Sequence, residues 1–259
     1  MKVSANLEFL WADMPLLQRI DAAARAGFRA VELHQPFEVE PKVLKARCRD
    51  AGVQLLGINT GKGSQADDQG LAAVPGRQAE ARALIEQALT YATEANATAV
   101  HILAGQVPPE QRSTGRAALL ASLDFAEDIV RDLDLMLQLE PLNEADAPGY
   151  FYSRVPEATA LIREHGGPQL RLMLDLYHVA MMGDDPVALI GENADIIGHV
   201  QIAGVPGRHE PDSGSYDFAP ALAALKARGY IGWIGAEYRA LAQVEDGLKW
   251  CAEALKAAG

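Results

Sequence analysis

The sequence predicts an α/β protein of the (β/α)8 TIM-barrel class, and three observations support this. Short apolar runs alternate with longer amphipathic segments from end to end, eight such runs occur, and the length of 259 residues is typical of one such barrel. The runs are almost continuously hydrophobic, as expected of parallel strands covered on both faces. No Pro/Gly/Ser-rich linker or change in composition divides the chain, so residues 1–259 are predicted to form a single domain.

The strand-like runs are evenly distributed along the chain. They span residues 2–7, 30–35, 54–59, 99–105, 135–141, 170–176, 196–202 and 232–238. The segments between them carry helix signals. In the first, apolar residues recur at helical spacing and Gly27 stands where a helix would end. A later one begins near Pro156 and stops at Gly166. Alternating strands and helices of this kind predict a parallel sheet.

A doubly wound α/β sheet is the alternative arrangement. It should carry a glycine-rich loop after the first strand, but residues 5–15 read ANLEFLWADMP. The stretch NTGKGS at 59–64 does not fit a phosphate loop either. Counted from Gly57 it is one residue short of GxxxxGK[ST], and Gly63 takes the Ser/Thr place. The barrel is therefore the favoured interpretation.

Composition and charge narrow the class of partner. The chain has 23 Lys and Arg against 35 Asp and Glu, a formal charge of −12, which argues against a nucleic-acid-binding surface. The first residues lack the apolar core and cleavage site of a signal peptide, and no segment approaches the ~18 continuous apolar residues of a membrane span. We expect a cytoplasmic protein with no nucleic-acid or membrane partner.

The last four runs share an unusual feature, because each delivers a carboxylate or an amide at its end. These residues are Glu140, Asp175, Gln201 and Glu237, spaced 35, 26 and 36 residues apart. The carboxyl ends of barrel strands meet at one mouth, where three carboxylates would repel unless a cation neutralised them. Oxygen ligands suit a hard divalent ion, Mg²⁺ or Mn²⁺, with Zn²⁺ and Co²⁺ left open. For each acid alone, a helix N-cap or a salt bridge is the alternative interpretation.

Polar residues also end the first four runs. They are Asn6, Glu32, Asn59 and His101, which we expect to line the same cavity without all binding metal. Asn6, Asn59 and His101 are candidates for binding the substrate. Lys62 lies in the loop after the third run, where it is either a substrate-binding cation or a solvated lysine.

Motifs along the chain resemble the hydroxypyruvate isomerase family of the xylose-isomerase-like barrel superfamily, which also holds sugar epimerases and endonuclease IV. The similar motifs run in order from Ser4 to about Trp250 and are SANLEFL, GFRAVEL, LAAVPGR, LEPLN, LDLYH, HVQIA and GYIGWIGAEY. The resemblance implies that Glu140, Asp175, Gln201 and Glu237 bind a divalent metal. It further implies that the two glutamates transfer protons.

Three more residues match more loosely. By resemblance, His178 contacts substrate, Arg208 lies near the metal and Asp146 is a carboxylate of the outer shell. A core histidine and a loop salt bridge are the alternatives for His178 and Arg208. A dimer or tetramer is also expected by resemblance alone.

The implied activity is the isomerisation of a small hydroxy-oxo acid, hydroxypyruvate or a 2-oxo-tetronate, through an enediolate. Lys62 and Arg208 are the candidates for holding its carboxylate. A ketose 3-epimerase, a polyol dehydratase and a non-catalytic sugar-acid-binding protein remain alternatives. An endonuclease would need a histidine-rich, three-zinc site and a basic groove, which six histidines and a charge of −12 do not favour.

Two loops depart from the family pattern. After the third run the isomerases carry a Pro-Gly-Asp-Trp type loop, whereas residues 59–70 here read NTGKGSQADDQG. A later Pro-Gly-Thr-Gly-Glu loop is replaced by PDSGS at 211–215, where Ser215 stands in place of a glutamate. The metal ligands that the resemblance implies are untouched by these changes, but the identity of the substrate does not follow from the resemblance.

Overall fold

Eight parallel strands close into a barrel in the computed structural model, which describes residues 1–251. Each strand pairs with the next in sequence, and β8 pairs back with β1. The strands are β1 Lys2–Asn6, β2 Ala30–Glu32, β3 Gln54–Asn59, β4 Ala99–His101, β5 Met136–Leu139, β6 Leu170–Asp175, β7 Ile197–Ile202 and β8 Trp233–Ala236. The predicted (β/α)8 class is confirmed. Residues 252–259 of the predicted single domain lie outside the described residues.

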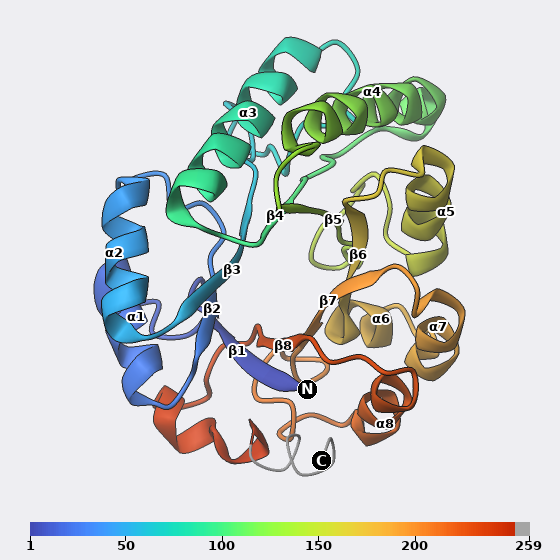
Figure 1. Ribbon diagram of the computed structural model, residues 1–259. Helices are drawn as coiled ribbons and strands as arrows, with labels where there is room; N and C mark the ends of the chain where they lie inside the picture. The colour runs from blue at the N-terminus through green and yellow to red at the C-terminus, as the bar shows by residue number, and fades with distance from the viewer. Residues whose placement is uncertain (252–259) are drawn as a thin grey trace.

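The helices form a ring around the barrel (Figure 1). They are α1 Leu16–Arg25, α2 Pro41–Ala51, α3 Gln78–Ala95, α4 Arg112–Val130, α5 Val155–His165, α6 Leu176–Met181, α7 Pro186–Asn193 and α8 Ala219–Ala227, with short 3₁₀ helices at Pro109–Gln111 and Val244–Gly247. Two helices, α6 and α7, connect β6 to β7. Within residues 1–251 no helix has the length and apolar character needed to cross a membrane.

Local sequence signals account for where the helices begin and end. In α5, Glu157 accepts hydrogen bonds from the backbone N–H groups of Ser153 and Arg154, a capping box beside Pro156. Its C-terminus is Gly166 at φ 69°, a left-handed conformation that glycine adopts without strain. Asp175 caps α6 by accepting from the backbone N–H of Tyr177 at 2.9 Å. The N-cap alternative therefore holds for one oxygen of Asp175.

Several strands are shorter than the apolar runs that predicted them. The run 99–105 contains only three strand residues, because after His101 the chain leaves the ladder and Ala104 forms an antiparallel bridge with Gly70. The run 30–35 likewise ends its pairing at Glu32. Among the last four strands, Glu140 and Glu237 directly follow β5 and β8, while Asp175 is the last residue of β6 and Gln201 lies within β7.

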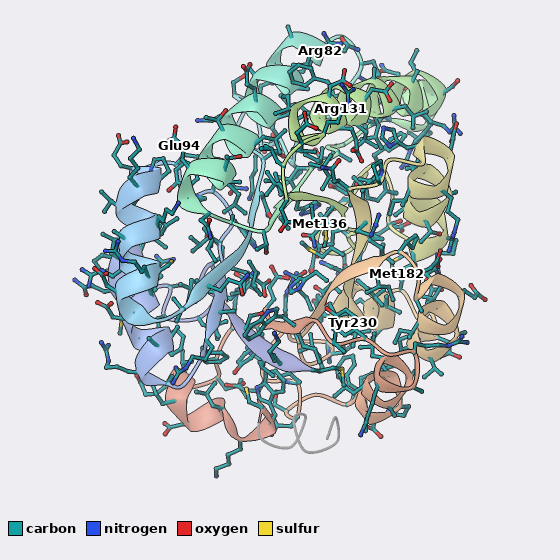
Figure 2. The ribbon with its side chains drawn as sticks, in the orientation of Figure 1. Arg82, Glu94, Arg131, Met136, Met182 and Tyr230 are labelled. Carbon is teal, nitrogen blue, oxygen red and sulfur yellow. The ribbon has the colours of Figure 1, made fainter. Side chains whose placement is uncertain are left out.

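The barrel interior is built in layers, because residues i and i+2 of a strand point to the same side. Asn6 and Gln201 lie toward the mouth, and two residues before them Ser4 and His199 lie one layer deeper. A cavity of about 280 Å³ lies along the barrel, and small residues such as Gly57 are part of its lining. Other lining residues lie at different depths, among them Met136, whose side chain Figure 2 shows near the barrel centre.

Candidate metal centre and active site at the barrel mouth

The four predicted ligands converge at the carboxyl ends of β5 to β8. Glu140, Asp175, Gln201 and Glu237 are all buried, at 6% exposed or less. An oxygen of Glu140, an oxygen of Asp175 and a ring nitrogen of His178 lie within 4.8 Å of one another. This cluster of three consists of Glu140, Asp175 and His178, and Glu237 is joined to it through Arg208, which pairs with both Asp175 and Glu237.

Arg208 lies beside this acidic cluster. Its Nη2 donates to Glu237 Oε2 at 2.8 Å and to Asp175 Oδ2 at 3.1 Å. The guanidinium lies over the rings of Phe9 and Tyr177, at 4.9 and 4.7 Å from their centroids. Burial lowers the pKa of Arg208, but the neighbouring carboxylates raise it above its usual value overall. Arg208 is thus a fixed cation of the site, in direct contact with two of the predicted ligands.

Glu237 has both oxygens engaged. Oε1 accepts from Asn6 Nδ2 at 2.9 Å and lies 2.9 Å from His34 Nε2, while Oε2 faces Arg208. Burial on its own would raise the pKa of this carboxyl. Arg208 and His34 outweigh that effect and lower the pKa to about 2. The carboxylate is therefore ionised across the physiological range.

Glu140 experiences the opposite environment. Burial raises its pKa well above the usual range, and the nearby charges of Glu237 and Asp175 raise it further. Burial also raises the pKa of Asp175 to about 7. Two glutamates at one mouth thus differ strongly in proton affinity because only Glu237 has Arg208 and His34 directly against it.

His178 is a neutral imidazole that contacts Asn143 through Nδ1 and lies 3.5 Å from Arg208 Nη1 through Nε2. Its Nδ1 lies 3.2 Å from the backbone N–H and 2.6 Å from the side-chain amide of Asn143. A backbone N–H can only donate, so Nδ1 is the unprotonated nitrogen and Nε2 carries the proton. Burial and then Arg208 lower the pKa of His178, which keeps it neutral. Nε2 lies 3.6 Å from Glu140 and 3.5 Å from Asp175. His178 is therefore the third member of the cluster with Glu140 and Asp175, and its Nε2 lies closer than 4 Å to both carboxylates.

The donor set fits a divalent cation. Among residues 1–251, Glu140 Oε1 and Gln201 Oε1 are buried oxygens without a hydrogen-bond partner. An unpaired buried oxygen costs free energy, and two of them beside two further carboxylates are what a hard cation would satisfy. Glu140, Asp175, Gln201 and Glu237 would supply oxygen ligands of the kind that Mg²⁺ and Mn²⁺ prefer.

A second buried network lies directly beneath Gln201. Its amide Nε2 donates to Glu32 Oε2 at 3.0 Å, and Glu32 Oε1 accepts from the hydroxyl of Ser4. His199 Nε2 lies 3.0 Å from the same Oε1. Burial would lower the pKa of His199, but Glu32 raises it above the usual value overall. Glu32, predicted as a strand end at the mouth, thus belongs to the layer below it.

The other predicted residues occupy varied positions. Asn6 holds Glu237, and Asn59 lines the barrel cavity. His101 is 1% exposed and lies behind Glu140, with Nδ1 3.3 Å from Oε2, and burial lowers its pKa to about 3. Asp146 accepts from Asn143 Nδ2 at 3.0 Å and from Arg208 Nη1 at 3.4 Å. Lys62 is exposed and lines a mouth cleft of about 740 Å³.

Three residues of the site were not predicted from the sequence. His34 contacts Glu237 and lines both the barrel cavity and the mouth cleft. Asn143 fixes the ring of His178. Arg239 lines the mouth cleft, 5.0 Å from the Phe9 ring. A signal existed for His34, since it lies two residues after Glu32 and so on the same side of its chain, one layer closer to the mouth.

An eight-stranded barrel with buried acids at the carboxyl ends of β5, β6 and β8 and a buried amide at the end of β7 defines a class of TIM-barrel proteins with an oxygen-lined, cation-compatible mouth. A family model described as xylose isomerase-like TIM barrel matches residues 20–254. The chain belongs to this family, and the full-length relatives below place it with the hydroxypyruvate isomerases as the motifs indicated.

Three relatives span nearly the whole chain. The 2-oxo-tetronate isomerase of Cupriavidus necator is 37% identical, covering 96% of both chains. The putative hydroxypyruvate isomerase of Homo sapiens is also 37% identical, covering 96% of this chain and 94% of that protein. The hydroxypyruvate isomerase of Escherichia coli is 31% identical, covering 96% and 98% respectively.

Solved structures share the fold. A Brucella melitensis protein described as AP endonuclease, family 2 superimposes with a TM-score of 0.94 at 32% identity, covering 98% of this chain and 99% of that one. The 3-keto-D-glucoside 4-epimerase of Escherichia coli gives a TM-score of 0.80 at 22% identity, covering 98% and 99%. At that identity the second comparison shows the fold alone.

Proposed function

We propose that this protein is a divalent-metal-dependent isomerase of small hydroxy-oxo acids, with hydroxypyruvate and 2-oxo-tetronates as the substrate candidates. The observation that carries the proposal is the pair of unpartnered buried oxygens, Glu140 Oε1 and Gln201 Oε1, among residues 1–251 at the mouth. The full-length similarity to proteins named as isomerases of such acids supports it.

The metal would be held by Glu140, Asp175, Gln201 and Glu237, with Mg²⁺ or Mn²⁺ favoured by an all-oxygen set. When bound, it would supply a positive centre that acidifies the C–H next to a carbonyl and stabilises negative charge.

Isomerisation of hydroxypyruvate moves a proton from C3 to C2 and a hydroxyl proton from O3 to O2, so the composition does not change. Glu140 and Glu237 face the mouth from β5 and β8 and would transfer the carbon-bound proton, one removing it and the other returning it. The held orientation of Glu237 and the free Oε1 of Glu140 suit these two roles. His178 would donate its Nε2 proton to a substrate oxygen.

The substrate carboxylate needs a cation that is not already paired. Arg208 is committed to Glu237 and Asp175, so it would stabilise charge at the reacting end instead. Lys62 and Arg239 are exposed and line the mouth cleft, which makes them the better candidates for the carboxylate. We therefore propose Lys62, one of the two candidates from the sequence, together with Arg239 for the substrate carboxylate, and a different role for Arg208.

Proton NMR of hydroxypyruvate in D₂O with the Mg²⁺-loaded protein tests the proposal. We expect enzyme-dependent loss of the C3 proton signal and the appearance of tartronate semialdehyde. The Glu237→Gln variant keeps the shape and removes the charge of one proton-transfer group, so it should lower the exchange rate at least about 100-fold.

The same assay is run with other substrates for comparison, a four-carbon 2-oxo-tetronate and neutral ketoses. Exchange with the tetronate alone would keep the isomerase proposal and move the substrate to four carbons. Epimerisation of a ketose with no exchange in either acid would overturn it in favour of a 3-epimerase.

A further inference from the structure

We infer that Glu32, supported by His199, is a positioning residue that fixes the side-chain amide of Gln201 so that its oxygen, not its nitrogen, faces the metal centre. An amide has two ends of similar size, and only the oxygen can bind a cation. Rotation by half a turn would present the NH₂ group to the metal and abolish that ligand. Something must therefore select the orientation. The inference rests on the proposed metal site.

The contacts of Gln201 carry the argument. Its Nε2 donates to Glu32 Oε2 at 3.0 Å, and its Oε1 is buried with no partner among the described residues. A carboxylate accepts and does not donate, so Glu32 can pair only with the NH₂ end. The flipped amide would set Oε1 against Glu32, and two acceptors in contact repel. Glu32 thus holds the NH₂ end, and Oε1 is left as the unpartnered end that a cation could bind.

Glu32 is itself held in place by a buried set of contacts. Its Oε1 accepts from the Ser4 hydroxyl and lies 3.0 Å from His199 Nε2. Ser4, Glu32 and His199 are at most 7% exposed. The space that Glu32 occupies exists because residue 235 is glycine: a Cβ there would lie 2.5 Å from Glu32 Oε1 and 2.9 Å from Gln201 Cγ. The barrel interior is therefore shaped around this carboxylate.

Such a contact beneath a ligand has a measurable effect. Loss of a hydrogen bond that orients a metal ligand typically lowers metal affinity about 10–100-fold. In Glu32→Gln, the new amide can turn either an acceptor or a donor toward Gln201, so the selection is lost. We expect the affinity of the metal-free protein for Mn²⁺, measured by titration calorimetry, to fall by about that factor.

Exchanging the two side chains separates orientation from general damage to the core. In the double variant Glu32→Gln and Gln201→Glu, the residue at 201 is a carboxylate whose two oxygens are equivalent, and the amide introduced at position 32 can donate to one of them. We expect Mn²⁺ affinity to return to within about threefold of the unsubstituted protein, by the same orientation argument. A merely structural role of Glu32 predicts no such recovery.

Controls keep the test decisive. Glu127→Gln makes the same chemical change on the outer helix α4, where Glu127 accepts from the backbone N–H of Gln169, and should leave Mn²⁺ affinity unchanged. If Glu32→Gln does not fold, Glu32→Asp keeps the charge but shortens the reach, and the same loss is expected. Unchanged Mn²⁺ affinity in a folded Glu32→Gln or Glu32→Asp protein would overturn the inference, and so would a double variant as weak as the single one. Failure of the unsubstituted protein to bind Mn²⁺ would instead refute the proposed metal site.

Discussion

Arg208 donates to Glu237 at 2.8 Å, and the same nitrogen lies 3.1 Å from Asp175, so one guanidinium pairs with two of the acids at the mouth. The guanidinium also lies over the aromatic rings of Phe9 and Tyr177. A planar, delocalised cation suits stacking and a shared hydrogen bond, and the compact ammonium of lysine does neither well. The acidic cluster is thus partly compensated by a built-in cation as well as by any metal.

Replacing Arg208 by Met should destabilise the protein, because removing one partner of a buried ion pair costs about 3–5 kcal/mol. The two carboxylates can take up protons instead, so the loss should be smaller at pH 5 than at pH 8. Thermal denaturation of the metal-free variant at both pH values measures this. Arg239→Met is the matched control, since Arg239 stacks on the same Phe9 ring but is exposed, and its midpoint should stay unchanged. Equal losses at the two pH values would contradict the pairing.

The pKa of Asp175 makes stability depend on pH in a defined direction. It is raised from 3.8 to about 7 by burial, so the folded metal-free protein holds a proton that the unfolded chain has already released. The unfolded state binds fewer protons in this window, and stability therefore falls as the pH rises from about 4 to about 7. Metal binding needs the ionised carboxylate, so metal affinity should rise over the same window and protons should be released.

Denaturation midpoints at pH 5, 6, 7 and 8, with and without Mg²⁺, test this dependence. We expect the metal-free midpoint to fall with pH and the stabilisation by Mg²⁺ to grow. Asp175→Asn leaves the other acids of the mouth in place but cannot titrate at 175, so its metal-free curve should be flatter. A metal-free midpoint that rises from pH 5 to pH 8 would refute the prediction. The pKa of Glu237 shifts in the opposite direction, down to about 2, so the stability that its ionised carboxylate contributes is lost only in strong acid.

His178 should prove to be a substrate contact and not a metal ligand. The backbone N–H of Asn143 points at Nδ1, which leaves the proton on Nε2. His178→Gln places an amide donor near the position of Nε2, whereas His178→Leu has none. We expect both variants to keep Mn²⁺ affinity within about threefold, since losing a ligand or its support costs about 10–100-fold. Turnover should fall about 100-fold in the leucine variant and less in the glutamine variant. A large loss of Mn²⁺ affinity in both would instead make His178 a ligand.

Much of this site could be predicted from strand ends. Glu140, Asp175, Gln201 and Glu237 stand at the polar ends of apolar runs, and a parallel barrel brings such ends together whatever the details of packing. The pattern did not predict how deep in the barrel each of these polar residues lies. Glu32 and His34 lie two residues apart on the same side of the chain, and the run 30–35 gives no sign of where pairing stops. The structure assigns the deeper layer to Glu32 and the mouth to His34.

Loop residues were harder to place for a physical reason. Asn143 contacts the ring of His178, and Arg239 lines the mouth cleft. Both positions depend on how loops pack in the folded protein, which no periodic pattern in the sequence predicts. Arg208 was placed near the metal only through family resemblance. Its positive φ of 53° and its position over two rings are tertiary features.

The mouth cleft should favour substrates that carry a carboxylate over neutral ones. Lys62 and Arg239 are exposed on it, and a bound carboxylate would gain from both. Lys62→Met and Arg239→Met should each raise the KM for a hydroxy-oxo acid about 10-fold, since a hydrogen bond to a charged group contributes about 1.5–3 kcal/mol before solvent screening. The turnover number should change less. Lys226→Met, an exposed lysine on α8, is the control. An unchanged KM in the double variant would place the carboxylate elsewhere.

Two glycines of the barrel interior should respond very differently to the same added methyl group. At Gly235 a Cβ would lie 2.5 Å from Glu32 Oε1, a distance that requires the carboxylate to move. At Gly57 the nearest atoms belong to Ala99 at 3.6 and 3.8 Å, which is ordinary van der Waals contact. We expect Gly235→Ala to cost about 1–3 kcal/mol of stability by overpacking and to weaken Mn²⁺ binding. Gly57→Ala should do neither. The methyl group at Gly235 would reach both Glu32 Oε1 and Gln201 Cγ, whereas the one at Gly57 reaches neither. A matched loss of Mn²⁺ affinity in the two variants would therefore show that the interior as a whole, and not this pair of side chains, sets the metal centre.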